Sequence, residues 1–143
     1  MTRLKLISML IVIILLAACN STATTQPAVE VVGKQVSVDG GSYTDMSVAE
    51  LQTMLANKDF TFVNVHIPFE GDIAGTDLSI PYDQIAQNLD KLPDKNAKIV
   101  LYCRSGRMSA IAAETLVGLG YTNVWNLDGG TVAWEGAGLE IKR

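Results

Sequence analysis

The residues best suited to covalent chemistry lie in one short segment, Cys103-Arg104-Ser105-Gly106-Arg107-Met108. It combines a nucleophilic sulfur, a flexible glycine and two permanent positive charges. Successive backbone N–H groups in such a turn can point inward and bind an anion, and a helix that follows adds the positive end of its dipole. These groups would stabilise a negatively charged sulfur. Cys103 is therefore the candidate catalytic nucleophile, and the candidate substrate-binding residues are Arg104, Ser105, Gly106, Arg107 and Met108.

Two regular elements are expected to hold this segment in place. Lys98–Tyr102 is a compact apolar strand that ends directly before Cys103. Ser109–Leu119 has apolar residues at helical spacing, and Gly120 ends it. Cys103 is thus expected at the carboxyl end of a strand, which is where ligands bind in open parallel sheets.

The rest of the domain alternates between strand and helix patterns. Ser47-Val48-Ala49-Glu50 has the spacing of a capping box, which predicts a helix over Ser47–Ala56. The other predicted elements are a strand at Phe60–Val65, a helix at Tyr82–Leu92, a strand at Val124–Leu127 and a helix at Thr131–Glu135. This alternation predicts an α/β fold of three layers, with a mainly parallel sheet and helices on both faces.

The first residues have the composition of an export signal. Arg3 and Lys5 precede the uncharged stretch Leu6–Ala18, whose 13 residues are too few for a membrane-spanning helix, which needs roughly 20. Leu16-Ala17-Ala18-Cys19 resembles the lipobox of bacterial lipoproteins, in which the cysteine receives diacylglycerol. We expect residues 1–18 to be a cleaved signal peptide and the lipid on Cys19 to hold the protein on the periplasmic or extracytoplasmic face of a membrane. The alternative is an ordinary signal peptide in which Cys19 occurs by chance.

The expected domain organisation places a lipidated N-terminus and flexible tether at residues 19–40 and one folded domain at residues 41–143. Asn20–Pro27 contains no charge and few groups that could be buried, as is typical of a tether. Without residues 1–18 the chain has 9 basic and 15 acidic residues, a formal charge of −6, which argues against a nucleic-acid partner. One histidine and one available cysteine fall short of the usual three or four zinc ligands, so no metal site and no cofactor are expected.

Four segments resemble the rhodanese-like sulfurtransferases, in the order in which that family has them. Cys103 to Ser109 resembles the active-site loop; the others are Phe60–Val65, Gly71–Thr76, and Asn126–Gly130 with Ala133-Trp134. The resemblance extends from about Tyr43 to Ile141. It implies that Cys103 takes sulfane sulfur from thiosulfate or a similar small anion and holds it as a persulfide cradled by loop amides. Cyanide or a thiol, including that of a partner protein, would accept the sulfur.

The chain departs from the family pattern at two places. Asn64-Val65-His66 stands where Asp-Val-Arg is usual, so the usual Asp to Arg ion pair cannot form. Asp72 lies where Gly-His-Ile-Pro-Gly has its histidine, and we interpret it as a turn or capping residue. A lone histidine in a loop, such as His66, is more often a surface or structural group than a functional one. Trp125 and Trp134 are expected in the core, and Gly129 and Gly130 are expected to supply unusual backbone angles.

Two alternatives to sulfurtransferase turnover use the same cysteine. A persulfide carrier or binding module would present sulfur to a partner protein and turn over small donors poorly. A cysteine phosphatase or arsenate reductase has a related fold with a larger loop and the pattern Cys-x5-Arg. Here the sixth residue after Cys103 is Ser109, which favours a ring sized for sulfur over one sized for phosphate.

Overall fold

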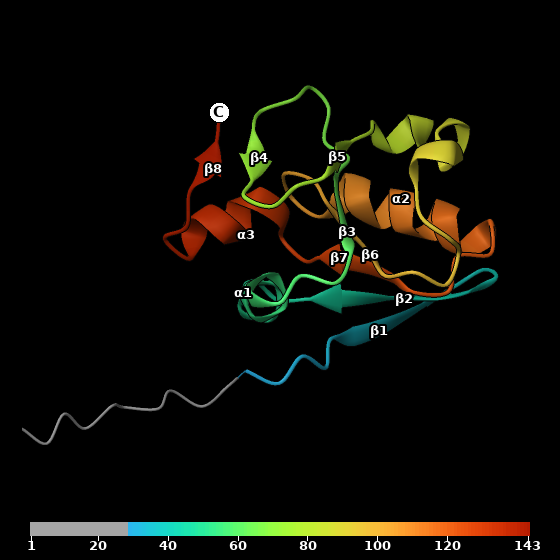
Figure 1. Cartoon of the computed structure of the whole chain (residues 1–143), viewed down its shortest axis with the longest axis horizontal. Coiled ribbons are helices and arrows are strands. Elements are labelled where there is room, and N and C mark those ends of the chain that lie inside the picture. Colours follow the sequence, from blue (N-terminus) through green and yellow to red (C-terminus); the bar gives the residue numbers. More distant parts are fainter. Residues whose placement is uncertain (1–28) are drawn as a thin grey trace, which may run out of the picture.

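The computed structural model describes residues 29–143, so the expected signal peptide, Cys19 and residues 20–28 of the expected tether lie outside the described residues. A sheet of six strands in the order β1-β2-β7-β6-β3-β5 forms the centre of the domain (Figure 1). These strands are β1 (Lys34–Val38), β2 (Gly41–Met46), β7 (Val124–Leu127), β6 (Ile99–Tyr102), β3 (Thr61–Asn64) and β5 (Leu78–Ser79).

All neighbours in this sheet are parallel except β1 and β2, which form an antiparallel pair at one edge. A separate two-stranded sheet joins β4 (Asp72–Ile73) to β8 (Ile141–Lys142). Figure 1 shows these two short strands side by side, next to α3 (Gly130–Gly136) and the C-terminal end of the chain.

Helices cover both faces of the central sheet, which confirms the predicted fold class. On one face, α2 (Arg107–Gly118) and the 3-10 helix η1 (Tyr82–Gln87) pack on residues such as Val63 and Leu101. On the other face, α1 (Val48–Ala56) and α3 pack on residues such as Phe62 and Val100. Successive residues of β3 and β6 thus point to opposite faces and are buried on both, as expected for central parallel strands.

One predicted helix differs in type from the structure. The region predicted as one helix over Tyr82–Leu92 is two 3-10 helices, η1 and η2 (Leu89–Lys91). Asn88 separates them because its side chain donates to the Gln84 carbonyl oxygen at 2.8 Å and its backbone N–H bonds to the Ile85 carbonyl oxygen, which closes a tighter turn than an α-helix has.

The folded domain also begins earlier than the expected boundary at residue 41. Lys34–Val38, which the sequence interpretation assigned to the tether, is strand β1, paired along its length with β2. Val36 and Val38 alternate along it and pack against the core cluster on the α2 face. Alternating apolar residues are typical of a strand, and this pattern was overlooked because the preceding residues have the composition of a tether.

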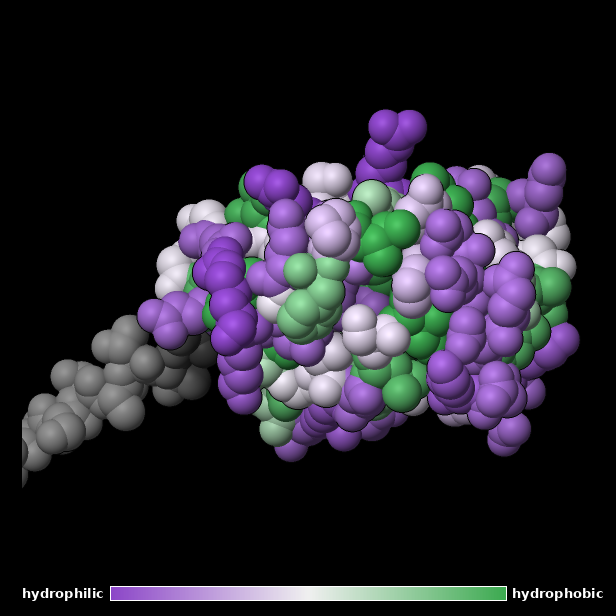
Figure 2. Space-filling view, turned by 90° about the horizontal axis from the view of Figure 1, so that it is seen from above, coloured by the Kyte–Doolittle hydropathy of each residue, from purple (hydrophilic) through white to green (hydrophobic). Residues whose placement is uncertain are grey.

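The outer surface is mainly hydrophilic on the face shown in Figure 2, with small apolar areas between polar and charged side chains. Within residues 29–143, no helix has the length and apolar character that crossing a membrane requires.

Candidate active site

The carboxyl ends of the central strands meet at one edge of the sheet, and Cys103 lies in the middle of that edge. The register pairs Asn64 of β3 with Tyr102 of β6, and the N–H of Val65 bonds to the Tyr102 carbonyl oxygen at 2.9 Å. On the other side of β6, Leu101 pairs with Asn126 of β7. The loops that follow β3, β6 and β7 are therefore neighbours around Cys103.

The sulfur of Cys103 is buried and accepts hydrogen bonds from its own loop. The Gly106 N–H donates to Sγ at 3.1 Å, and Cys103 as a whole is 1% exposed. The Ser109 hydroxyl lies 3.4 Å from the same sulfur and 3.1 Å from the Gly106 carbonyl oxygen, and can donate to either. Sequence reasoning did not count Ser109 among the site residues, because a serine near a helix start more often caps the helix than contacts a sulfur.

Glycine at position 106 allows the loop to close under the sulfur. Gly106 has φ +90° and is the N-cap of α2, so the helix begins at Arg107, two residues before the predicted start. A side chain here would strain the backbone and would press on the Gly129 nitrogen at 3.1 Å. The positive end of the α2 dipole therefore points toward the Cys103 sulfur, as expected from the sequence.

The start of α3 holds the other side of the loop through two backbone hydrogen bonds. The N–H groups of Thr131 and Val132 donate to the carbonyl oxygens of Cys103 and Arg104, each at 2.9 Å. Gly129 and Gly130 make this approach possible with φ +73° and +55°, which confirms the backbone angles predicted for them. A Cβ atom on Gly130 would overlap the Cys103 carbonyl oxygen.

The five residues after Cys103 have different environments. Gly106 contacts the sulfur, whereas Arg104, Ser105 and Arg107 are exposed at the loop surface. Met108 is half-buried and packs against the core cluster on the α2 face. Arg104 forms an ion pair with Glu70 at 3.5 Å, but Arg107 has no ion pair within residues 29–143.

Glu70 is a site residue that the sequence did not reveal. Its Oε1 faces Arg104, and its Oε2 lies 3.3 Å from Nε2 of His66, whose side chain is 12% exposed. Neither ring nitrogen of His66 has a hydrogen-bond partner within the part of the chain that the structure describes. The Glu70 carboxylate thus stands between an imidazole and a guanidinium at the mouth of the site.

Residues 47–137 match the family described as the Rhodanese-like domain. The chain belongs to the rhodanese-like domain family. A protein named Sulfurtransferase from Allochromatium vinosum is 36% identical over 93 residues, which cover 63% of this chain and 85% of that protein. The rhodanese-like domain protein of Staphylococcus aureus has a solved structure that is 34% identical, with a TM-score of 0.58, covering 69% of this chain and 98% of that one.

A second kind of relative is much longer than this rhodanese-like chain. A tRNA uridine(34) hydroxylase from Erwinia tasmaniensis is 32% identical over 103 residues, which cover 67% of this chain but 29% of that protein. The similarity therefore concerns one part of the longer protein.

In this rhodanese-like domain a partly buried polar network surrounds Asn64, at the carboxyl end of β3. Asn64 donates to the Gly71 carbonyl oxygen at 3.0 Å and to Asp72 Oδ1 at 2.9 Å. The Tyr102 hydroxyl donates to the same Asp72 oxygen at 3.0 Å, and burial raises the pKa of Tyr102. Asp72 thus joins β4 to β3 and β6, and its prediction as a turn or capping residue is wrong because it lies in strand β4.

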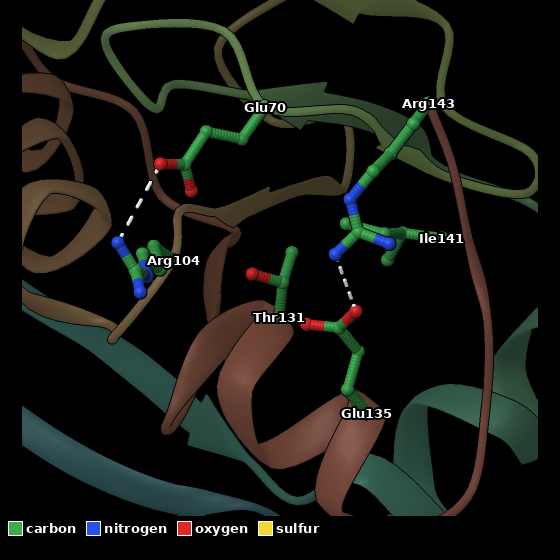
Figure 3. A pocket seen from close by; sticks show the side chains of 6 residues that line it. All are labelled: Glu70, Arg104, Thr131, Glu135, Ile141 and Arg143. Carbon is green, nitrogen blue, oxygen red and sulfur yellow. Dashed lines mark hydrogen bonds and ion pairs between the residues drawn. The ribbon is translucent and has the colours of Figure 1, made fainter.

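Beside the loop Cys103–Met108 lies a pocket of about 350 Å³ (Figure 3). Its lining has two acidic and two basic side chains together with a threonine and an isoleucine: Glu70, Glu135, Arg104, Arg143, Thr131 and Ile141.

Within residues 29–143, no group of three or more histidine, cysteine or acidic side chains is placed to hold a metal ion. Trp134 is buried in the core as predicted, and Trp125 packs partly buried against it.

Proposed function

We propose that this domain is a sulfurtransferase in which Cys103 carries sulfane sulfur as a persulfide. The Cys103 thiolate attacks the outer sulfur of thiosulfate or a similar anionic donor. The sulfur–sulfur bond of the donor breaks, and sulfite leaves with the bonding electron pair. In the second half-reaction cyanide or a thiolate attacks the outer sulfur of the persulfide, and Cys103 leaves again as a thiolate. Neither step needs a metal, an oxidant or a reductant.

The observation that carries this proposal is the hydrogen bond from the Gly106 N–H to Cys103 Sγ at 3.1 Å. It shows that the loop already directs a backbone donor at the sulfur, at the positive end of a helix of 12 residues. Donors fixed in place before the reaction stabilise developing negative charge without reorganisation. The loop carbonyl oxygens are bonded to α3, so these donors are held rigidly.

A phosphatase or arsenate reductase is supported less well by the same loop. Ser109, which takes the sixth place after Cys103, directs its hydroxyl toward the sulfur and lies fully buried. The sixth place therefore lacks the arginine that would bind a tetrahedral oxyanion in the Cys-x5-Arg pattern. The hydroxylase activity in the name of the longer relative is not proposed, because the chain spans 29% of that protein's length.

A persulfide carrier for a partner protein remains the second candidate. It is favoured by the burial of Cys103, which is 1% exposed, because a partner that opens the site would give an acceptor access to the sulfur. The two functions differ only in the acceptor. Transfer to free cyanide at a rate equal to or above transfer to a protein thiol would support the sulfurtransferase.

The test is to incubate the purified protein with thiosulfate and to measure its intact mass. Wild type is expected to gain one sulfur atom, which cyanide or a thiol then removes, whereas Cys103→Ser is expected to gain none. A circular-dichroism melt shows whether the variant is folded. If no donor loads wild-type Cys103, the proposed function is wrong and phosphate and arsenate substrates become the next to test.

We further propose that the protein is exported and anchored by a lipid on Cys19. This proposal is supported by the basic start, the 13 uncharged residues Leu6–Ala18 and the position of Cys19 directly after them. The sulfur donor and acceptor would then be substrates available outside the cytoplasm.

A further inference from the structure

The pocket beside the Cys103 loop carries charges of both signs in two facing pairs. Glu70 and Arg104 lie 3.5 Å apart on one side, and Glu135 and Arg143 lie 2.6 Å apart on the other. Figure 3 shows the four side chains directed toward a common space, with Thr131 between the pairs. All four are at least 40% exposed, so a ligand can reach them.

The backbone around the pocket is fixed by close contacts. Antiparallel pairing of Asp72 with Lys142 joins β4 to β8 and brings Arg143 toward the loop that carries Glu70. Gly71 has φ +125°, and a Cβ atom there would lie 2.6 Å from the Lys142 carbonyl oxygen, so this approach requires glycine. The pairing of β4 with β8 and the close contact at Gly71 therefore hold the two charge pairs opposite each other.

The size and charge of the pocket fit a larger ligand than the sulfur donor. A volume of about 350 Å³ lies within the range of sites for small organic molecules, and one water occupies only about 30 Å³. Two arginines and two glutamates give the lining no net charge, so it has no strong preference for a dianion such as thiosulfate. It complements a molecule with both a carboxylate and an ammonium group.

The pocket borders the reactive cysteine without containing its sulfur. Arg104 directly follows Cys103, and the N–H of the lining residue Thr131 bonds to the Cys103 carbonyl oxygen at 2.9 Å. Cys103 itself is not among the lining residues. A ligand that uses both places must therefore have its charged end several bonds away from the atom that reacts with the sulfur.

We propose that this pocket binds the zwitterionic end of a small peptide-type thiol that accepts sulfur from Cys103. This inference rests on the proposed sulfurtransferase function and specifies its acceptor. The thiolate of the acceptor attacks the outer sulfur of the Cys103 persulfide, and the bond between the two sulfurs breaks. Cys103 leaves with the electron pair, and the acceptor departs as a persulfide.

The experiment separates the two half-reactions. Protein loaded with thiosulfate and freed of excess donor is mixed either with glutathione, which carries an ammonium and two carboxylates, or with uncharged 2-mercaptoethanol. The rate of persulfide loss is followed by intact mass. Each variant is compared with wild type for each thiol separately, which cancels the different intrinsic reactivities of the two thiols.

Arg143→Gln and Glu135→Gln test the pair farther from Cys103. For each variant we expect kcat/KM with glutathione to fall about 3- to 10-fold, as for the loss of a partly exposed charged contact, and the value with 2-mercaptoethanol to change less than about 2-fold. Lys34→Gln and Glu114→Gln remove the same charges from exposed positions on β1 and α2 and serve as matched controls.

The possible results distinguish this inference from the proposed function. If wild type loads sulfur but the pocket variants react equally with both thiols, or change neither rate, the pocket is not the acceptor site and sulfurtransfer still stands. If wild type does not load sulfur, the proposed function and the acceptor assignment both fail.

Discussion

The Cys103 sulfur is surrounded by loop backbone and by one hydroxyl, rather than by the arginines that make the segment conspicuous. Gly106 and Ser109 both contact the sulfur, at 3.1 and 3.4 Å. Arg104 is 59% exposed and shares its charge with Glu70, so its field at the sulfur is weakened by solvent and by the carboxylate. If the Cys103 sulfur carries negative charge, as proposed, the conformation of the loop is therefore the main source of its stabilisation.

Ser109→Ala should slow sulfur loading without unfolding the protein. The Gly106 carbonyl oxygen keeps its hydrogen bond from the Ala110 N–H at 3.0 Å, so the substitution leaves no buried backbone group without a partner. The loss of one neutral donor to the sulfur corresponds to about 1 kcal/mol, or roughly 5-fold in the rate of persulfide formation with thiosulfate. Rapid mixing with thiosulfate, quenching at set times and measurement of the intact mass give this rate.

Thr115→Ala is the matched control for this variant. Thr115 also lies on α2, and among residues 29–143 its hydroxyl bonds only to the Ile111 carbonyl oxygen, one helical turn back. It should load sulfur at the wild-type rate. An unchanged rate in Ser109→Ala would mean that the hydroxyl stays with the Gly106 carbonyl oxygen during the reaction.

The sequence allowed the position of Cys103 between a strand and a helix to be predicted, but not all of its neighbours. Cys103 follows an apolar strand and precedes a helix, and these are local signals. Glu70 lies 34 residues from Arg104, and their contact depends on the path of the loop between β3 and β4. An isolated glutamate in such a loop has no pattern that distinguishes it from surface charge.

At the scale of elements, prediction succeeded where the pattern is local. The capping box at Ser47 is present, and Val124–Leu127 is a strand over the predicted residues. Lys34–Val38 was missed because an edge strand is short and half-exposed, and its pairing with β2 is what makes it regular. The small sheet of β4 and β8 joins segments far apart in the chain, which no local pattern can predict.

Glu50 connects the segment before β1 to the start of α1 and should make stability depend on pH. Its carboxylate accepts hydrogen bonds from the N–H groups of Val32, Gly33 and Ser47 at 3.0, 2.8 and 2.8 Å. Burial alone would raise the pKa of Glu50, but these bonds outweigh it and lower the pKa from 4.5 to about 2. Because the folded-state pKa is the lower one, this stabilisation is present above about pH 4.5 and is lost as the pH falls toward 2.

Glu50→Gln is therefore expected to destabilise the domain at neutral pH and to have little effect in acid. We expect the free energy of unfolding to fall by about 1 kcal/mol at pH 7, as for the loss of a helix cap, and the difference from wild type to shrink below pH 4.5. Urea unfolding at several pH values measures it. Glu114→Gln, on the exposed side of α2, is the control. A difference that is the same at pH 3 and pH 7 would contradict the role of the charge.

At the scale of the whole molecule, the arrangement of strands explains why one edge carries the site. The carboxyl ends of β3, β6 and β7 come together there, and the N–H of Asp128 extends the edge to β2 through the Met46 carbonyl oxygen at 3.0 Å. The start of α3 then closes on the Cys103 loop. Parallel order thus converts four separate segments of sequence into one site.

The proposed export of the protein affects the state of its two cysteines, Cys19 and Cys103. A lipid on the sulfur of Cys19 would leave Cys103 without a partner for an intramolecular disulfide in an oxidising compartment. Burial of Cys103, at 1% exposure, limits contact with other thiols. If exported as proposed, the domain would therefore keep the Cys103 thiol free of disulfides.

Lipidation at Cys19 can be tested in cells that express the full chain. Wild type is expected to incorporate labelled palmitate and to show an intact mass that lacks residues 1–18 and carries diacylglycerol, because the lipid is added at the cysteine that becomes the new N-terminus. Cys19→Ala should incorporate no label, whereas Cys103→Ser, which removes the other thiol, should incorporate as much as wild type. A processed wild-type protein without lipid would instead indicate an ordinary signal peptide, and the domain would then reach its substrates free of the membrane.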